Sequence, residues 1–296
     1  MSDKSIGEII ASAMRSRFIE TNGIRLEVHE TGDPNGKPVV LLHGFPEFWY
    51  GWRKQIDALA NSGHRVIIPD QRGYNRSDKP QGRFAYRLDY LAADIIGILD
   101  QLGIERTCLI GHDWGGVVAW HLAMHHPERL IKLVNLNIPH PKVMVKNLKN
   151  NPDQRRRSWY IFFFQLPKVP EFVLGKNNFE NMVKILERTS RKGTFTEQDF
   201  EKYREAWAQP GALTGMINWY RSSVRMMFVK RQSPRISVPT KLIWGMRDKA
   251  LSDVMAQPSI DYCDYGELAF IENASHWVQH EEPAQVNRLI LDFLND

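Results

Sequence analysis

The sequence predicts an α/β fold, in which a mostly parallel sheet carries helices on both faces and a helical lid is inserted into the chain. Two observations lead to this fold class. Short apolar runs alternate with stretches of helical period, and the alternation stops between about Pro139 and Pro234 before it resumes. Parallel strands need crossover connections, which are usually helices, so the alternation indicates a parallel sheet and the interruption indicates an insertion.

The composition of the 296-residue chain agrees with such a fold. Hydrophobic residues make up 43% of the chain and charged residues 25%, as in soluble globular proteins. We expect three segments, which are a first part of the core at residues 1–138, a helical lid at 139–234 and a second part of the core at 235–296.

The elements of the first segment follow in a regular order. Two strand-like runs, residues 17–22 and 24–31, are separated by Gly23, so we expect an antiparallel hairpin. Continuous apolar runs, typical of strands buried on both faces, follow at 39–44, 65–70, 107–111 and 131–137. Stretches of helical period lie between these runs, at 50–63, 86–103 and 115–126.

The rest of the chain contains the lid and the end of the sheet. Residues 139–234 have helical period, are rich in aromatic side chains and lysine, and contain no strand-like run. Strand-like runs return at 240–245 and 267–276. A final amphipathic helix has its apolar positions at Val286, Ile290, Leu291 and Leu294. Because α/β sheets bind ligands at the carboxyl ends of their strands, we expect the lid to cover that edge.

The net charge of +5 is modest, and the densest basic stretches are 142–150 and 155–157 in the predicted lid. We interpret them as a solvated helix surface, with no nucleic acid partner and with attraction to anionic membranes as a less favoured alternative. The chain has no apolar run of membrane-spanning length and no signal-peptide pattern, so we expect a cytosolic protein without a transmembrane segment. The sequence leaves open whether it is a monomer or a homodimer. A short helix packed on the domain is expected from the apolar positions Ile6, Ile9, Ile10 and Met14.

No cofactor is predicted from the cysteines and histidines. Cys108 and Cys263 lack the spacing of a disulfide framework or a metal site, so we expect both to be buried packing residues. His121 and His125 have helical i, i+4 spacing, but no glutamate lies between them and no third ligand is evident. We therefore predict no metal.

Residues capable of nucleophilic catalysis follow three of the predicted strands. The stretch "LIGHDWGGVVAW" has the G-x-S-x-G pattern of a nucleophile turn, with Asp113 in place of the serine. Asp248 follows the run at 240–245, and His276 ends the run at 267–276. Nucleophile, acid and histidine thus occur in the chain order of hydrolase triads, at the edge where strand ends meet.

The motifs "HGFPE", "GHDWGG", "WGMRDK" and "ASHWVQHEEP" resemble those of the soluble epoxide hydrolases of the α/β-hydrolase superfamily. The resemblance extends from about Arg17 over nearly the whole chain. It implies the α/β-hydrolase fold with an eight-stranded sheet, and a stand-alone hydrolase domain without a phosphatase domain or membrane anchor. One departure is Asn75, where relatives usually have glycine. Asparagine tolerates the positive φ expected there, so we predict little functional consequence.

The resemblance also implies the roles of the site residues. Asp113 is the implied nucleophile, and His276 is the base that activates water. Asp248 is the acid that orients the His276 ring. Two lid motifs, "YIFFFQLP" and "PGALTGMINWYR", supply Tyr160 and Tyr220, which correspond to the paired lid acids of the family.

Further residues have less specific roles. The backbone N–H groups of Phe45 and Trp114 are expected to form an oxyanion hole. Glu47 has two interpretations of equal weight, since it could hold the hydrolytic water or order its loop. Residues expected in the substrate pocket or the core around it are Trp49, Phe163, Phe164 and Trp277.

An aspartate nucleophile suits attack on saturated carbon. It forms an alkyl ester that water can hydrolyse, whereas a serine would form an ether that water cannot cleave. In this scheme His276 begins as a neutral base. An epoxide leaves as an alkoxide, which needs a proton, and phenols hold theirs at neutral pH. The predicted partners are therefore a small lipophilic epoxide and water, and the product is a vicinal diol.

Two alternatives stay open at this point. A haloalkane or haloacid dehalogenase would use the same nucleophile. Against it, Phe45 stands where an asparagine would complete a halide site, and Trp114 stands where an arginine would hold a substrate carboxylate. The other alternative is a non-catalytic small-molecule receptor on this fold, which would need neither a triad nor an oxyanion hole.

Overall fold

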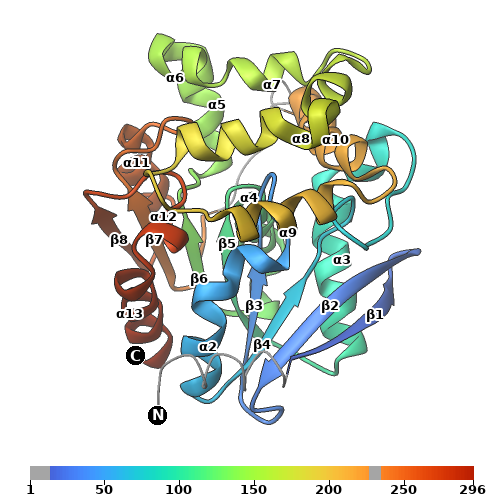
Figure 1. Ribbon diagram of the computed structural model, residues 1–296. Coiled ribbons are helices and arrows are strands. Elements are labelled where there is room, and N and C mark those ends of the chain that lie inside the picture. The colour runs from blue at the N-terminus through green and yellow to red at the C-terminus, as the bar shows by residue number, and fades with distance from the viewer. Residues whose placement is uncertain (1–13, 227–234) are drawn as a thin grey trace.

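The structure is a computed structural model, and it describes residues 14–226 and 235–296. The helix predicted around Ile6, Ile9 and Ile10, and the end of the lid at 227–234, lie outside the described residues. Eight strands form one sheet in the order β1-β2-β4-β3-β5-β6-β7-β8 (Figure 1). Their bounds are β1 Arg15–Thr21, β2 Ile24–Gly32, β3 Lys37–Leu42, β4 His64–Pro69, β5 Thr107–His112, β6 Leu130–Leu136, β7 Thr240–Gly245 and β8 Gly266–Ile271.

The direction of the strands confirms the predicted topology. Strand β2 pairs antiparallel with β1 and with β4, while all pairs from β4 to β8 are parallel. The hairpin turns at Asn22 and Gly23, both of which have positive φ. Six neighbouring parallel strands therefore place their carboxyl ends at one edge of the sheet.

Helices cover both faces of the sheet because the strand side chains alternate. On β3, Val39 and Leu41 pack in one apolar cluster with helices α2 (Arg53–Asn61) and α13 (Pro283–Asn295). Val40 and Leu42 pack in a second cluster with α3 (Leu88–Gln101) and α4 (Trp114–His125). This period of two is typical of a strand buried on both faces. Cys108 and Cys263 are buried and unbridged, as predicted.

The inserted segment lies over the strand ends (Figure 1). Its helices are α5 Pro141–Asn150, α6 Pro152–Arg157, α7 Trp159–Phe163, α8 Val169–Thr189 with non-helical residues at 176–179, α9 Glu197–Trp207 and α10 Ala212–Met226. Two indole N–H groups join it to core loops, since Trp207 donates to the Pro46 carbonyl at 2.6 Å and Trp219 to the Arg72 carbonyl at 2.9 Å. The segment boundaries at 138/139 and 234/235 stay predictions.

Short helices complete the fold. They are η1 Trp49–Trp52, η2 Arg83–Tyr86, η3 Pro127–Arg129, η4 Asp253–Met255, α11 Ala256–Ile260 and α12 Val278–Glu281. Within the described residues, no helix combines the length and the apolar character needed to cross a membrane. The cytosolic location stays a prediction.

Candidate active site

The turn between β5 and α4 presents the side chain of Asp113. Its backbone has φ 49° and ψ −120°, a conformation that costs free energy in any residue with a side chain. The neighbouring backbone comes very close to this turn. A Cβ on Gly44 would lie 2.4 Å from the Asp113 Cβ, and a Cβ on Gly115 would lie 2.1 Å from the Leu42 carbonyl oxygen. Glycine at both positions therefore allows the strained turn and the loop after β3 to meet.

The Asp113 carboxylate has a partner for each oxygen. The Phe45 N–H donates to Oδ1 at 2.8 Å, and Nε2 of His276 lies 3.6 Å from Oδ2. Burial by itself raises the pKa of Asp113, but the hydrogen bond and charge of His276, then His112 and the Phe45 N–H, outweigh it and lower the pKa. Asp113 is therefore ionised at neutral pH, as a nucleophile must be. Trp114 opens helix α4, so its N–H is one of those that a helix leaves without an intrahelical acceptor.

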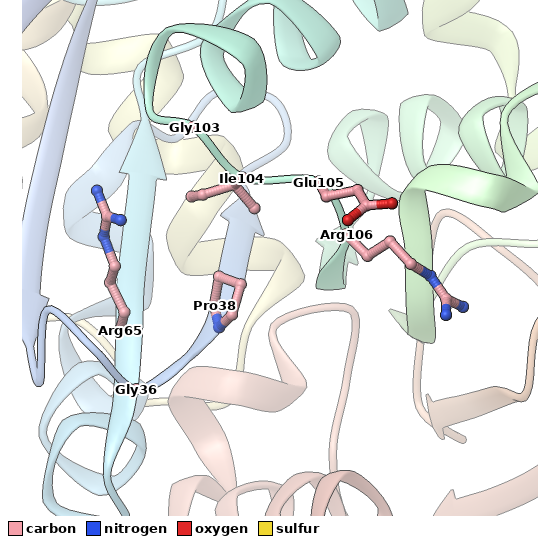
Figure 2. A pocket seen from close by; sticks show the side chains of 7 residues that line it. All are labelled: Gly36, Pro38, Arg65, Gly103, Ile104, Glu105 and Arg106. Carbon is pink, nitrogen blue, oxygen red and sulfur yellow. The ribbon is translucent and has the colours of Figure 1, made fainter.

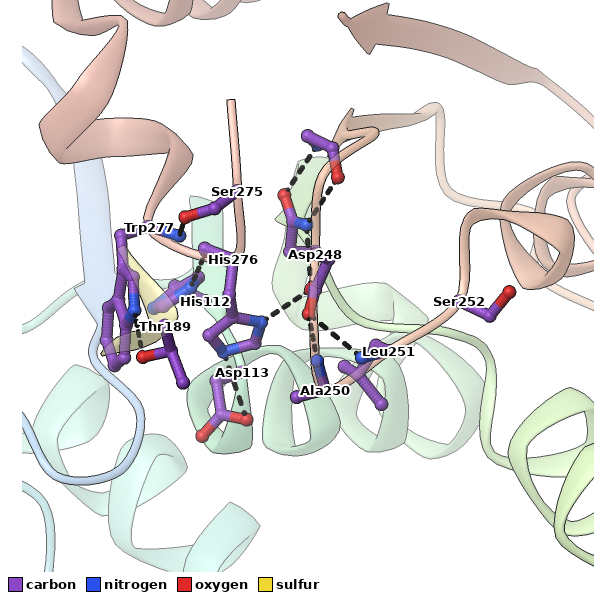
Figure 3. A network of polar contacts seen from close by, with 12 residues as sticks. His112, Asp113, Thr189, Asp248, Ala250, Leu251, Ser252, Ser275, His276 and Trp277 are labelled. Carbon is purple, nitrogen blue, oxygen red and sulfur yellow. Dashed lines mark hydrogen bonds and ion pairs between the residues drawn. The ribbon is translucent and has the colours of Figure 1, made fainter. Parts of the chain in front are cut away.

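His276 lies between two carboxylates (Figure 3). Its Nδ1 is 2.7 Å from Oδ2 of Asp248. The backbone N–H groups of Ala250 and Leu251 donate to the other oxygen of Asp248 at 2.7 and 2.9 Å, and the amide of Asn137 donates to Oδ2 at 2.9 Å. These donors fix the orientation of Asp248, and Asp248 in turn orients the imidazole ring.

The two carboxylates change the resting charge of His276. Burial lowers its pKa, but the charge of Asp248 and the hydrogen bonds and charge of Asp113 and Asp248 raise the pKa to about 10. This raised pKa favours an imidazolium paired with Asp113 in the free protein, in contrast to the neutral base expected from the sequence. Neutralisation of Asp113 would remove one of the two charges that raise this pKa.

The lid tyrosines lie together above the nucleophile turn. The rings of Tyr160 on α7 and Tyr220 on α10 have centroids 5.9 Å apart, and Tyr220 packs edge-on against Trp114 at 5.0 Å. Burial and, next, the negative charge of Asp113 raise the pKa of both phenols. Both phenols therefore keep their protons at neutral pH, and both lie close enough to Asp113 for its charge to raise their pKa.

The four aromatic residues expected around the pocket occupy different places. Phe164 is buried against Phe45 and Tyr220, with centroid distances of 5.5 and 4.8 Å, so it lines the space beside the tyrosines. Trp277 packs edge-on against the His276 ring at 5.1 Å. Phe163 contacts Phe164 and Trp159.

Trp49 takes a packing position beside strand β2. Its ring lies 4.7 Å from that of His29, and its backbone N–H donates to Asp70 at 2.7 Å. Asn75 donates to the same carboxylate at 2.6 Å and has φ 41°, which agrees with the expected positive φ.

Glu47 is the centre of a buried polar network that connects the core to the lid. Its Oε1 accepts hydrogen bonds from Tyr203 of α9 at 2.6 Å and from Nε2 of His280 at 2.7 Å, and its Oε2 accepts one from Gln279 at 3.1 Å. Burial raises the pKa of Glu47, but His280 and His112 together hold it well below the usual value. These contacts support loop ordering, while the water-holding role stays a prediction.

Several residues that were not among the predicted site residues support the site. Asn137, at φ 44°, bonds both Asp248 and the Gly245 backbone. Nε2 of His112 lies 2.8 Å from the His276 carbonyl oxygen, and Arg157 of α6 donates to the Asp248 carbonyl at 2.7 Å. The signal for Asn137 was present, because it directly follows a buried strand.

Possible metal ligands gather at one place in the described residues. The ligand atoms of Glu27, His29 and Asp70 lie within 4.8 Å of one another. The Arg76 guanidinium lies 3.0 Å from Glu27. The amide of Asn75 and the backbone N–H of Trp49 donate hydrogen bonds to Asp70. These groups serve only part of the cluster, because Oε2 of Glu27 and Nε2 of His29 are buried without a hydrogen-bond partner.

A depression of about 310 Å³ lies at the opposite edge of the sheet (Figure 2). It is lined near the amino ends of β3, β4 and β5 by Gly36, Pro38, Arg65, Gly103, Ile104, Glu105 and Arg106. Arg65 is bound to Glu30 at 2.8 Å, and Arg106 donates to the Leu130 carbonyl at 2.7 Å. This depression is separate from the Asp113 site.

Comparisons with known proteins place this geometry in context. The family profile for the alpha/beta hydrolase fold matches residues 37–283. The AB hydrolase superfamily protein YfhM of Bacillus subtilis is 49% identical over 96% of this chain and 99% of its own. Mouse epoxide hydrolase 4 is 41% identical over 94% of this chain and 78% of its own. The crystal structure of a Bacillus megaterium epoxide hydrolase with an inhibitor has a TM-score of 0.88 at 30% identity, and covers 95% of this chain and all of that one.

Proposed function

Because this chain belongs to the epoxide hydrolases of the α/β-hydrolase fold, we propose that it opens epoxides to vicinal diols through a covalent ester on Asp113. The observation that carries the proposal is an ionised aspartate whose charge reaches two protonated tyrosines, of which Tyr220 is buried and Tyr160 half-buried. Asp113 has a lowered pKa and both phenols have raised ones, within one enclosure. A nucleophile and an acid are thus available at the same pH.

In the first step, Oδ2 of Asp113 attacks an epoxide carbon. The ring carbon–oxygen bond breaks, and the ring oxygen takes a proton from Tyr160 or Tyr220. Oδ1 becomes the carbonyl oxygen of the ester and keeps the Phe45 N–H, which lies 2.8 Å away in the free protein. His276 faces Oδ2, the oxygen that carries the alkyl group.

In the second step, water hydrolyses the ester. Loss of the Asp113 charge lowers the pKa of His276, so the imidazolium releases its proton to solvent and becomes a base. His276 then takes a proton from water, and the water oxygen adds to the Asp113 carboxyl carbon, with the developing charge on Oδ1. The bond to the alkyl oxygen breaks, and that oxygen takes the proton from His276. The carboxyl group then passes its proton to the tyrosinate, and His276 takes up a proton from solvent, which restores the starting protonation of the site.

The lining of the site favours a neutral, lipophilic epoxide. Phe45, Phe164 and Tyr220 form an aromatic cluster beside Trp114, with centroid distances from Tyr220 of 4.8 to 5.4 Å. Trp114 offers no cation to a substrate carboxylate at the position beside the nucleophile.

The variant His276→Gln tests the ester directly, because it removes the base of the second step and leaves the first. Incubated with styrene oxide, the variant should accumulate a covalent adduct on Asp113 whose mass equals the intact epoxide. The wild-type protein should release diol and show no lasting adduct.

Parallel assays with a haloalkane and a fluoro-acid separate the alternatives. Halide release without diol formation would identify a dehalogenase. Binding of the epoxide with neither adduct nor diol would identify a receptor.

A further inference from the structure

The outer side of helix α7 and the start of α8 carry a concentration of exposed apolar side chains. Five of the thirteen exposed large apolar side chains in the described part of the chain lie between positions 159 and 172. We call this set the lid face, and it consists of Trp159, Phe162, Leu166, Val169 and Phe172. Trp159 is 63% exposed and Phe172 71%, so both offer most of their surface to solvent.

These side chains are not a poorly packed part of the core. Helix α7 buries its other side through Ile161, and Phe164 just after the helix packs against Phe45 at 5.5 Å. The same short segment thus lines the catalytic enclosure with one side and exposes aromatic rings on the other. Exposed apolar patches on folded proteins commonly mark sites of contact with a partner or a membrane.

The charge of the chain is divided between the lid and the core. Residues 139–234 contain 18 lysines and arginines and eight acidic residues, a net charge of +10, whereas the rest of the chain carries −5. Helices α5, α6 and α7 share the side of the molecule farthest from the sheet (Figure 1). Exposed cations on these helices and in the turn before α8 are Lys146, Lys149, Arg155, Arg156 and Lys168.

We propose that the lid face docks on the surface of an anionic lipid bilayer. Aromatic and aliphatic side chains would enter the headgroup region, while the neighbouring lysines and arginines contact lipid phosphates and carboxylates. The charge selects this occupant over a second copy of the chain, because two lids placed face to face would oppose +10 with +10. Docking of this kind needs no transmembrane segment and does not depend on the reaction proposed above.

Vesicle sedimentation tests the proposal with the full-length protein. The vesicles contain phosphatidylcholine alone or with 30 mol% phosphatidylserine (about one lipid in three anionic). The protein should pellet with the anionic vesicles at about 0.1 M salt, and raising the salt to about 0.5 M should weaken binding at least about fivefold. The double variant Trp159→Ser with Phe172→Ser should weaken binding to the anionic vesicles at least about tenfold. The double variant Lys146→Gln with Lys149→Gln should weaken binding about fivefold for each charge removed.

Val254→Ser with Tyr265→Ser is the matched control, because these exposed apolar residues, 58% and 69% exposed, lie on the core side of the chain. This variant should bind vesicles like the wild type. Thermal melts check that all variants fold, and light scattering measures their mass. Lack of vesicle binding, equal binding to both vesicle types, or equal losses in both double serine variants would overturn the proposal. So would a dimer that Trp159→Ser with Phe172→Ser converts to a monomer, since the lid face would then be a contact between copies.

Discussion

The core half and the lid half of the site differ in the charge of the side chains that they contribute. In the core half, Asp113, His276 and Asp248 are charged groups that stand at strand ends and hold one another by hydrogen bonds and ion pairs. In the lid half, Tyr160 and Tyr220 are neutral and sit among aromatic rings. Charges that must be aligned thus lie on the rigid sheet edge, and the lid contributes groups that must stay uncharged.

Burial raises the pKa of Asp113 and of both lid tyrosines, but the net pKa shifts in the two halves are opposite. It is the largest influence on Asp113 and on both tyrosines. For the tyrosines nothing outweighs it, so their pKa values rise. For Asp113 the surrounding hydrogen bonds and positive charge outweigh it, so its pKa falls. Hydrogen-bond and charge partners, rather than burial, therefore decide that Asp113 is ionised, as the proposed nucleophile must be, while the tyrosines stay protonated, as the proposed acids must be.

The largest expected effect comes from the core half. Asp113→Ala removes the only group that can form the ester, so kcat/KM for styrene oxide should fall by at least about 10⁴-fold. Diol formation measured by chromatography checks this, and circular dichroism checks the fold. Turnover above a few per cent of the wild-type rate would mean that the core half does not supply the nucleophile.

Changing the lid half should affect only one step. Tyr160→Phe with Tyr220→Phe removes both acids, and the rate of ester formation should fall by about 10²–10⁴-fold. Rapid-quench mass spectrometry of the protein measures the ester directly. Tyr50→Phe, which removes another tyrosine hydroxyl bonded to the lid, is the control and should keep the wild-type rate. An unchanged rate in the double variant would contradict the proposed division of roles.

The pH dependence should separate the two halves further. Ester formation needs Asp113 ionised and the tyrosines protonated, and their pKa values are shifted below 3.8 and above 10 respectively, so its rate should be nearly flat between about pH 5 and 9. Ester hydrolysis needs neutral His276, whose pKa is about 10 with Asp113 charged and lower in the ester.

The rate of ester hydrolysis should therefore depend on the protonation of His276. Below the pKa of His276 in the ester, the hydrolysis rate should fall about tenfold for each pH unit, and above it the rate should level off. Single-turnover kinetics at several pH values measure both steps. A hydrolysis rate that rises on acidification would exclude His276 as the base.

The smallest effect is expected at the contact between the halves. Tyr203→Phe removes the 2.6 Å hydrogen bond from the lid to the buried, charged Glu47, and should lower the free energy of unfolding by about 1.5–3 kcal/mol. Urea denaturation measures it. Tyr50→Phe loses a bond to the less buried Asp199 and should cost less. Equal losses would show that the Glu47 network does not specially hold the lid.

Much of the core could be predicted because local pattern and topology agree there. The hairpin, the parallel strands and the helices between them follow from apolar period and glycine positions, and the strand ends identify where Asp113, Asp248 and His276 lie. Asn75 was predicted to adopt positive φ, and it does. Each of these features depends on a few neighbouring residues.

The lid could be predicted only as helical. Helix α7 has five residues, too few for its period to show which aromatic side chains are buried. Phe164 is buried beside Tyr220, whereas Trp159 and Phe162 are exposed, although all three belong to one aromatic run. The sequence left Trp49 between a pocket role and a core role, and its packing beside His29 favours the core.

By itself, the sequence determined the fold class and predicted the chemical type of the nucleophile and the order of the triad, because these depend on residue identity and on strand ends that parallel topology brings to one edge. Only the tertiary structure decided which charges face one another. The resting protonation of His276, the Glu47 contact with the lid and the exposure of the lid face arise between residues far apart in the chain. The distances between these residues set the electrostatic and packing energies, and the local sequence pattern does not determine those distances.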